Sequence, residues 1–233
     1  FIEEGCTNSM KDIPINNSHV LDALNNFLWY YENRDLVQRN VVLNGSPDQR
    51  KHFMSEKYRD EIIAMDEKHE GFPDGGHSFA LKADRVHHLI GRDKNPEYAG
   101  LIERYSRYNQ QLCQLLCTKN NALTQMYPPD GFISWHNNAN ASAYNLIFSW
   151  SETGEGCFRY IDGHTGKEVV MQDKKGWQCK SGYFGSYREP WYERVYHAAE
   201  TDCWRITVSY MFDRSDMSLG LQDEAIEEIM SDF

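Results

Sequence analysis

The chain has 233 residues, of which 40% are hydrophobic, and its 24 Lys and Arg residues against 35 Asp and Glu residues give a net charge of −11. This composition excludes a disordered chain, and the negative charge disfavours a general nucleic-acid binder, which needs a basic surface to displace counterions from phosphates. No apolar run approaches the ~18 residues that span a bilayer, and the first residues, FIEEGCTNSMKD, lack the basic and apolar stretches of a signal peptide. We therefore expect a soluble, cytoplasmic protein without a membrane partner and, from its acidity, a small or basic substrate.

The first half of the chain is expected to be helical. Asn17 and Ser18 can cap a helix that runs through HVLDALNNFLWYYEN, where apolar residues recur at spacings of three and four. Similar spacing predicts helices near 56–69 and from about 98 to 126. We expect residues 1–126 to form a helical support region packed on the rest of a single domain.

The pattern changes after Tyr127, where two prolines and a glycine end the helical spacing. Eight short segments rich in Val, Ile, Thr and aromatic residues follow, separated by Gly, Asp or Asn: GFISWHN, AYNLIFSWS, GCFRYID, KEVVMQ, GWQCK, GYFG, RVYHAA and WRITVSYMF. Such a series is typical of a β-sandwich, barrel or jelly roll. The sequence thus predicts an α+β fold with a jelly-roll core at 127–212 and an acidic C-terminal tail at 213–233 that includes a helix, QDEAIEEIM.

Polar residues on two of these segments form a candidate site. Residues two apart in a strand share a face, so His136 and Asn138 can face the same point, and His197 can approach it from a neighbouring strand. Arg205 and Thr207 share a face of the last strand with Ser209, and the other face carries Ile206, Val208 and Tyr210. A buried arginine needs an anionic partner, and either a bound carboxylate or a structural acid would satisfy it.

The order of these residues resembles the jelly-roll core of the iron(II)- and 2-oxoglutarate-dependent oxygenases, particularly the prolyl-hydroxylase-like and phage-encoded branches. The elements that carry the resemblance lie within 127–212: Tyr127-Pro128, His136-x-Asn138, Gly154-Glu155-Gly156-Cys157-Phe158, Gly182-Tyr183-Phe184, His197 and Arg205-x-Thr207. The resemblance implies that His136, Asn138 and His197 are the iron ligands. It further implies that Arg205 holds the far carboxylate of 2-oxoglutarate, with Thr207 and Tyr127 as additional hydrogen-bonding groups.

Position 138 departs from the family pattern, which has Asp or Glu there. An asparagine offers a neutral and weaker oxygen ligand, whereas two histidines and a carboxylate form the usual facial triad. Four outcomes stay open: Asn138 ligates and hydroxylation persists, a halide fills the position as in related halogenases, iron binding is lost and a binding module remains, or Glu152 or Glu155 substitutes. A cupin-like metal enzyme that uses no 2-oxoglutarate is a further alternative.

The sequence thus favours a 2-oxoglutarate-dependent dioxygenase with iron(II) and 2-oxoglutarate as cofactors. As the resemblance implies, such an enzyme hydroxylates its substrate and releases succinate and CO2. Its expected partners are 2-oxoglutarate, O2 and a small-molecule or side-chain substrate that the sequence does not identify. Nucleic acid is disfavoured as a substrate but not excluded.

Overall fold

The computed structural model describes residues 10–82, 96–119, 121–139 and 141–232. Its strands are β1 (Lys11–Ile13), β2 (Leu43–Asn44), β3 (Gly76–Ala80), β4 (Asn121–Tyr127), β5 (Phe132–His136), β6 (Ala143–Ser151), β7 (Gly156–Ile161), β8 (Glu168–Gln172), β9 (Gly176–Phe184), β10 (His197–Thr201) and β11 (Arg205–Phe212). Its α-helices are α1 (Ser18–Asn25), α2 (Leu28–Glu32), α3 (Arg34–Asn40), α4 (Arg50–Phe53), α5 (Glu56–Met65), α6 (Pro96–Leu115), α7 (Arg214–Ser218) and α8 (Leu221–Met230).

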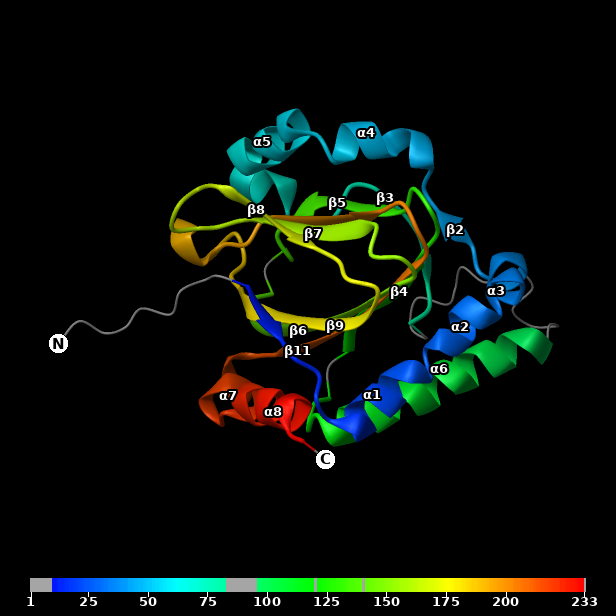
Figure 1. Cartoon of the computed structure of the whole chain (residues 1–233). Coiled ribbons are helices and arrows are strands. Elements are labelled where there is room, and N and C mark those ends of the chain that lie inside the picture. The colour runs from blue at the N-terminus through cyan, green and yellow to red at the C-terminus, as the bar shows by residue number, and fades with distance from the viewer. Residues whose placement is uncertain (1–9, 83–95, 120, 140, 233) are drawn as a thin grey trace.

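The strands form one antiparallel sheet that curls into two facing layers. The order across the sheet is β1-β9-β6-β11-β4-β3-β5-β10-β7-β8, with β2 paired to β3. Figure 1 shows β6, β9 and β11 in one layer and β5, β7 and β8 in the other, with β4 and β3 near the turn between the layers. From β4 onward the chain passes repeatedly from one layer to the other, so residues far apart in sequence face each other across the interior.

Helices cover the outer face of each layer. Helices α1, α6, α7 and α8 lie below the layer that contains β11, and α4 and α5 lie above the opposite layer (Figure 1). The first group of helices and β11 share a buried apolar cluster that includes Leu24, Leu112, Val208 and Ile229. Burial of these side chains holds the helices against the outer face of the sheet. The polar residues described below lie on the inner side, between the two layers.

The N-terminal helices begin where the sequence predicts. The side chain of Asn17 caps α1 by accepting hydrogen bonds from the backbone N–H groups of His19 and Val20. The predicted single helix is divided into α1 and α2, with α3 following. The acidic C-terminal helix is confirmed as α8, and the predicted segments GWQCK and GYFG are one strand, β9.

The predicted helix from about 98 to 126 is wrong in its second half. Helix α6 ends at Leu115, and Cys117 then adopts a φ of +49°, which ends the helical course of the chain. Residues 121–127 form β4, which pairs with β11 on one side and β3 on the other. Apolar residues such as Leu123 fit both the spacing of a helix and that of a strand. Hydrogen bonding to strands on both sides makes this segment a strand.

The described part of the chain has the predicted α+β class: a curled antiparallel sheet with helices on both outer faces. In the ranges that the structure covers, no helix combines the length and the apolar character needed to cross a lipid bilayer.

Candidate functional site

Two histidines from neighbouring strands lie side by side between the two layers. His136 is the last residue of β5 and His197 is the first residue of β10, and the pairing of these strands sets them directly opposite each other. Their ring centroids are 4.1 Å apart, and both residues are buried. The structure therefore brings together two residues of the predicted site that are far apart in sequence.

An irregularity in the pairing of β5 with β10 determines which way His136 faces. His136 pairs with His197, the first residue of β10. Three residues earlier on β5, Ile133 pairs with Ala199, which is only two residues further along β10. One extra residue on β5 is a β-bulge, and it shifts the alternation of side chains between the two faces of the strand. As a result Ile133 and His136 both line the interior cavity, whereas Trp135 packs outside in the cluster beneath α5.

The hydrogen bonds of the two rings leave the same nitrogen available in each. Nδ1 of His136 lies 2.7 Å from the carbonyl oxygen of Ser134, and Nδ1 of His197 lies 2.9 Å from that of Val195. Because a carbonyl oxygen can only accept, each Nδ1 carries the proton and donates it. Each neutral ring then keeps a lone pair on Nε2, which is the arrangement in which a backbone carbonyl orients a metal-binding histidine.

Burial favours the neutral form of both rings. It lowers the pKa of His136 to about 4, against the opposing effect of the hydrogen bond to Ser134. The pKa of His197 is also lowered, first by burial and then by the proximity of His136. At neutral pH the two Nε2 atoms are therefore unprotonated, as a metal ligand requires.

Asn138 reaches the same cavity from a turn rather than from the strand. Strand β5 ends at His136, and Asn138 and Ala139 have φ values of +62° and +56°, in the left-handed region. The carbonyl oxygen of Gly71 accepts hydrogen bonds from the N–H groups of Asn137 and Ala139, at 3.3 and 3.0 Å. The expectation that His136 and Asn138 share a strand face is wrong because the strand has ended, but both residues line the cavity.

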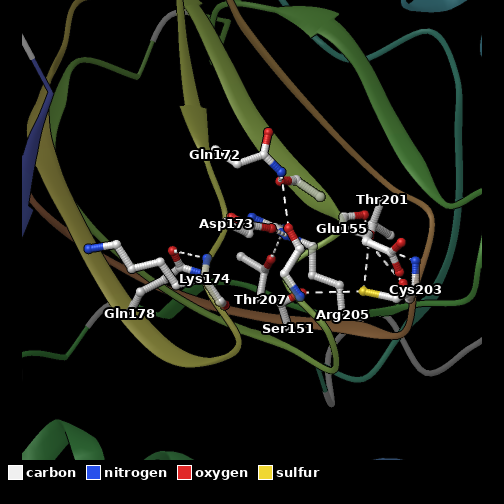
Figure 2. A network of polar contacts seen from close by, with 12 residues as sticks. Ser151, Glu155, Gln172, Asp173, Lys174, Gln178, Thr201, Cys203, Arg205 and Thr207 are labelled. Atoms are coloured by element: carbon white, nitrogen blue, oxygen red, sulfur yellow. Dashed lines mark hydrogen bonds and ion pairs between the residues drawn. The ribbon is translucent and has the colours of Figure 1, made fainter.

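Arg205 and Thr207 lie at the start of β11 and face the cavity, as the alternation along that strand predicts. The buried guanidinium of Arg205 donates from Nε to Oδ2 of Asp173 at 2.7 Å and from Nη1 to Oγ1 of Thr207 at 2.5 Å (Figure 2). Asp173 lies just after β8. It is the kind of structural acid that the sequence left open as a partner for Arg205.

Tyr127 is opposite Arg205 in the pairing of β4 with β11. Its ring centroid lies 5.8 Å from the guanidinium carbon, and its hydroxyl group donates to Oε1 of Gln125 at 2.6 Å. Burial raises the pKa of Tyr127 to about 12, although the charge of Arg205 opposes the shift. The phenol is thus protonated at neutral pH and can act as a hydrogen-bond donor.

All six residues of the predicted site line one cavity of about 580 Å³: Tyr127, His136, Asn138, His197, Arg205 and Thr207. The rings of Phe158 and Phe184 lie close to His197, with centroid separations of 5.6 and 4.6 Å. Among the described residues that line the cavity, none is Asp or Glu, and the charged side chains are Lys82 and Arg205. A basic substrate, which the acidity of the whole chain favoured, does not fit these walls.

Among the residues that the structure describes, no carboxylate accompanies the two histidines. In the described ranges, no group of three His, Cys, Asp or Glu side chains is placed to hold a metal. Glu152 accepts a hydrogen bond from the hydroxyl of Tyr31, Glu155 accepts one from Thr153, and neither acid lines the cavity. Substitution for Asn138 by either acid therefore has no support, and the amide oxygen of Asn138 or an external ligand stays open for a third position.

Sequence reasoning did not identify three residues on which this arrangement depends. Asp173 and Lys180 are both buried, and their carboxylate and ammonium groups are 3.6 Å apart. In the sequence Asp173 resembles an ordinary turn residue between two strands, and Lys180 resembles an exposed strand residue. The carbonyl oxygen of Gly71 holds the turn that carries Asn138.

No protein-family model and no curated protein matches the chain. Among solved structures it is similar to a prolyl-4-hydroxylase from Pseudomonas putida, with 13% identity and a TM-score of 0.33 over 80% of this chain and 100% of that one. It is also similar to YcfD, a ribosomal oxygenase from Escherichia coli, with 13% identity and a TM-score of 0.27 over 72% of this chain and 47% of that one. At these values the likeness identifies no family, and the roles of the site residues rest on the geometry of this chain.

Proposed function

We propose that this chain is a non-haem iron(II), 2-oxoglutarate-dependent oxygenase that hydroxylates its substrate. The observation that carries the proposal is the combination, in one cavity, of two neutral histidines with available Nε2 atoms and a buried arginine. The sequence resemblance described above supports the same assignment. We further propose that residues 127–212 form a double-stranded β-helix, supported by the repeated passage of the chain between the two layers.

His136, His197 and Asn138 would hold the metal. Imidazole nitrogen and oxygen ligands suit iron(II), and two histidines with one oxygen ligand leave positions open for a cosubstrate and O2. The Nδ1 hydrogen bonds to backbone carbonyls hold each ring in one orientation. The amide oxygen of Asn138 is neutral, so we expect iron(II) to bind more weakly than at a site with a carboxylate.

Arg205 would bind the far carboxylate of 2-oxoglutarate, assisted by Thr207 and Tyr127. An arginine pairs well with a carboxylate because its planar donors match the two oxygens. The cavity volume of about 580 Å³ is within the range that small-molecule sites occupy. The lack of acidic side chains among the described lining residues also favours an anionic cosubstrate.

Iron(II) and 2-oxoglutarate, when bound, supply the oxidising chemistry, in which O2 is consumed, the cosubstrate becomes succinate and CO2, and the substrate gains a hydroxyl group. The chain contributes three things to this reaction. Its histidines stay neutral and orient their Nε2 atoms, its arginine orients the cosubstrate, and its buried aromatic walls at Phe158 and Phe184 exclude water from the site.

Anaerobic uptake of iron(II) tests the metal site. We expect the wild-type protein to retain one iron(II) per chain after gel filtration and His197→Ala to lose it. His164→Ala is the matched control, since His164 is exposed and stacks on Tyr192 away from the cavity lining. Equal iron content in the wild-type protein and His197→Ala would contradict the assignment.

A further inference from the structure

The anion-binding arginine is already paired with a carboxylate, which by itself would weaken it. Nε of Arg205 is 2.7 Å from Oδ2 of Asp173, and the two side chains are 2% and 0% exposed. An isolated pair of this kind is neutral and would attract a ligand carboxylate only weakly. A cavity that binds an anion through Arg205 therefore needs a further positive charge near this pair.

Lys180 supplies the missing charge. Its Nζ lies 3.6 Å from Oδ1 of Asp173, its side chain is 1% exposed, and it donates a hydrogen bond to Oε1 of Gln178 at 3.1 Å. Burial lowers the pKa of Lys180, and the charge of Asp173 opposes that shift. With Lys180 protonated, two positive groups share one carboxylate, which gives the buried cluster of Arg205, Lys180 and Asp173 a net charge of +1. Asp12 faces Lys180 across the pairing of β1 with β9, but it is exposed and is screened by solvent.

The cluster is arranged so that its positive side meets the cavity. Arg205 and Thr207 line the cavity, whereas Asp173 and Lys180 are not among its described lining residues. Strand β7 holds Asp173 in place, because the backbone N–H of Asp173 donates to the carbonyl oxygen of Gly156 at 2.8 Å. A side chain at Gly156 would come within 2.7 Å of Oδ2 of Asp173, so the strand approaches the carboxylate closely. An unbalanced buried charge is costly, and an anion that reaches Arg205 from the cavity would balance it.

We propose that Asp173 and Lys180 are positioning residues for the anionic end of the cosubstrate: Asp173 fixes the guanidinium group of Arg205, and Lys180 restores the positive charge that Asp173 would otherwise cancel. This inference rests on the proposed function and adds two residues that do not contact the ligand. We therefore expect the affinity for 2-oxoglutarate to depend on the net charge of the cluster and not on whether each contact within it is kept.

Three variants test the role of that charge with little change of shape. Lys180→Met reduces the cluster to zero, Asp173→Asn removes the negative charge while keeping an oxygen that can accept from Nε of Arg205, and the double variant keeps a charge of +1 on Arg205. In anaerobic titrations of the iron(II)-loaded protein with 2-oxoglutarate, we expect Lys180→Met to bind about tenfold more weakly or worse. We expect Asp173→Asn to bind at least as tightly as the wild-type protein and the double variant to recover most of the loss. Iron(II) uptake should be the same in all four proteins.

Recovery of the affinity for 2-oxoglutarate in the double variant is the decisive result. If the two substitutions acted by damaging packing, their losses of affinity would add and would not cancel. If Asp173→Asn does not fold because two buried cations then lack an acid, the double variant, in which only Arg205 is charged, still makes the comparison with Lys180→Met. Equal affinity in these two variants, or a weaker double variant, would overturn the roles of Asp173 and Lys180 while leaving the proposed function intact. A wild-type protein that takes up iron(II) but binds no 2-oxoglutarate would overturn the proposed cosubstrate, and this inference with it.

Discussion

At the scale of single residues, the proposed metal site depends most on Asn138, which we propose as its third ligand. Asn138 is the only one of the three proposed ligands that lies outside a strand, and its left-handed backbone sets it in the cavity beside His136. We expect Asn138→Asp to tighten iron(II) binding by about tenfold or more, because a carboxylate adds a negative charge next to the metal. Anaerobic competition with a chelator measures this affinity.

Asn145→Asp is the matched control for that variant. Asn145 lines the same cavity from β6, where its amide donates to the carbonyl oxygen of Ala143 at 3.0 Å. Asn145→Asp adds the same charge to the cavity walls without changing a proposed ligand. Equal tightening in both variants would indicate a general effect of charge, and unchanged affinity in Asn138→Asp would mean that Asn138 does not face the metal.

Arg205 gives the complementary prediction for the cosubstrate. We expect Arg205→Met to weaken 2-oxoglutarate binding by about tenfold or more and to spare iron(II) uptake, since the histidines lie on other strands. Isothermal titration under anaerobic conditions measures both affinities, with Arg188→Ala as a control at an exposed arginine. An unchanged affinity for 2-oxoglutarate in Arg205→Met would remove Arg205 from the proposed clamp.

At the scale of elements, the loop at Gly71 fixes the turn after β5. Gly71 has a φ of +75°, and a Cβ at this position would lie 2.1 Å from Oδ1 of Asn137 and 2.5 Å from the backbone nitrogen of Ala139. Gly166 has a similar φ of +67°, but no atom of the described residues lies within 4 Å of the position that a Cβ would take there. The two glycines therefore separate the cost of the backbone conformation from the cost of the close contact.

We expect Gly166→Ala to lower the free energy of unfolding by about 1 kcal/mol, which is the cost of the left-handed conformation alone. Gly71→Ala should cost more, by about 1–3 kcal/mol in addition, and should also weaken iron(II) binding because the turn that carries Asn138 must move. Urea denaturation measures the stabilities. Equal losses in the two variants would show that the contact of Gly71 with the turn has no structural role.

The sequence predicts the meeting of the six residues of the predicted site at one cavity better than it predicts the elements that hold them. Alternation along β11 places Arg205 and Thr207 on one face, and the helical spacing and cap of α1 are local features that sequence patterns capture well. The bulge in β5 could not be predicted, because it depends on the register that β5 adopts against β10. The buried partners Asp173 and Lys180 are similarly hidden, because only the closure of the two layers removes them from water.

At the scale of the whole molecule, the distribution of charge distinguishes the interior from the surface. The chain carries a net charge of −11, yet the described residues that line the cavity include no acid and two basic side chains. Helices cover both outer faces of the curled sheet (Figure 1), and His136, His197 and Arg205 are buried between its layers. An interior of this kind suits anionic ligands, whose charge is attracted more strongly where water is excluded.

Because several tyrosines are buried, we expect the stability of the fold to fall at alkaline pH. The pKa of Tyr127 is raised to about 12 by burial, from about 10 in an unfolded chain. The unfolded state therefore loses its proton at lower pH, and the stability that Tyr127 contributes, about 3 kcal/mol, is present below about pH 10 and is lost as the pH rises toward about 12. The pKa values of Tyr30 and Tyr210 are raised for the same reason and act in the same direction.

Urea denaturation at a series of alkaline pH values measures this loss. Tyr127→Phe should be less sensitive to pH than the wild-type protein, whereas Tyr192→Phe, at an exposed position, should behave like the wild type. A Tyr127→Phe protein that loses stability with the wild-type pH dependence would show that Tyr127 does not contribute to it.

His136, His197 and Arg205 are proposed to act together as one site for iron(II) and 2-oxoglutarate. An anaerobic titration of the purified protein with iron(II) and then with 2-oxoglutarate, followed by visible absorption, tests this proposal. We expect the weak charge-transfer band of the chelated cosubstrate to appear in the wild-type protein and to be absent in His197→Ala. A correctly folded wild-type protein that shows no band at saturating iron(II) and 2-oxoglutarate would contradict the proposed function.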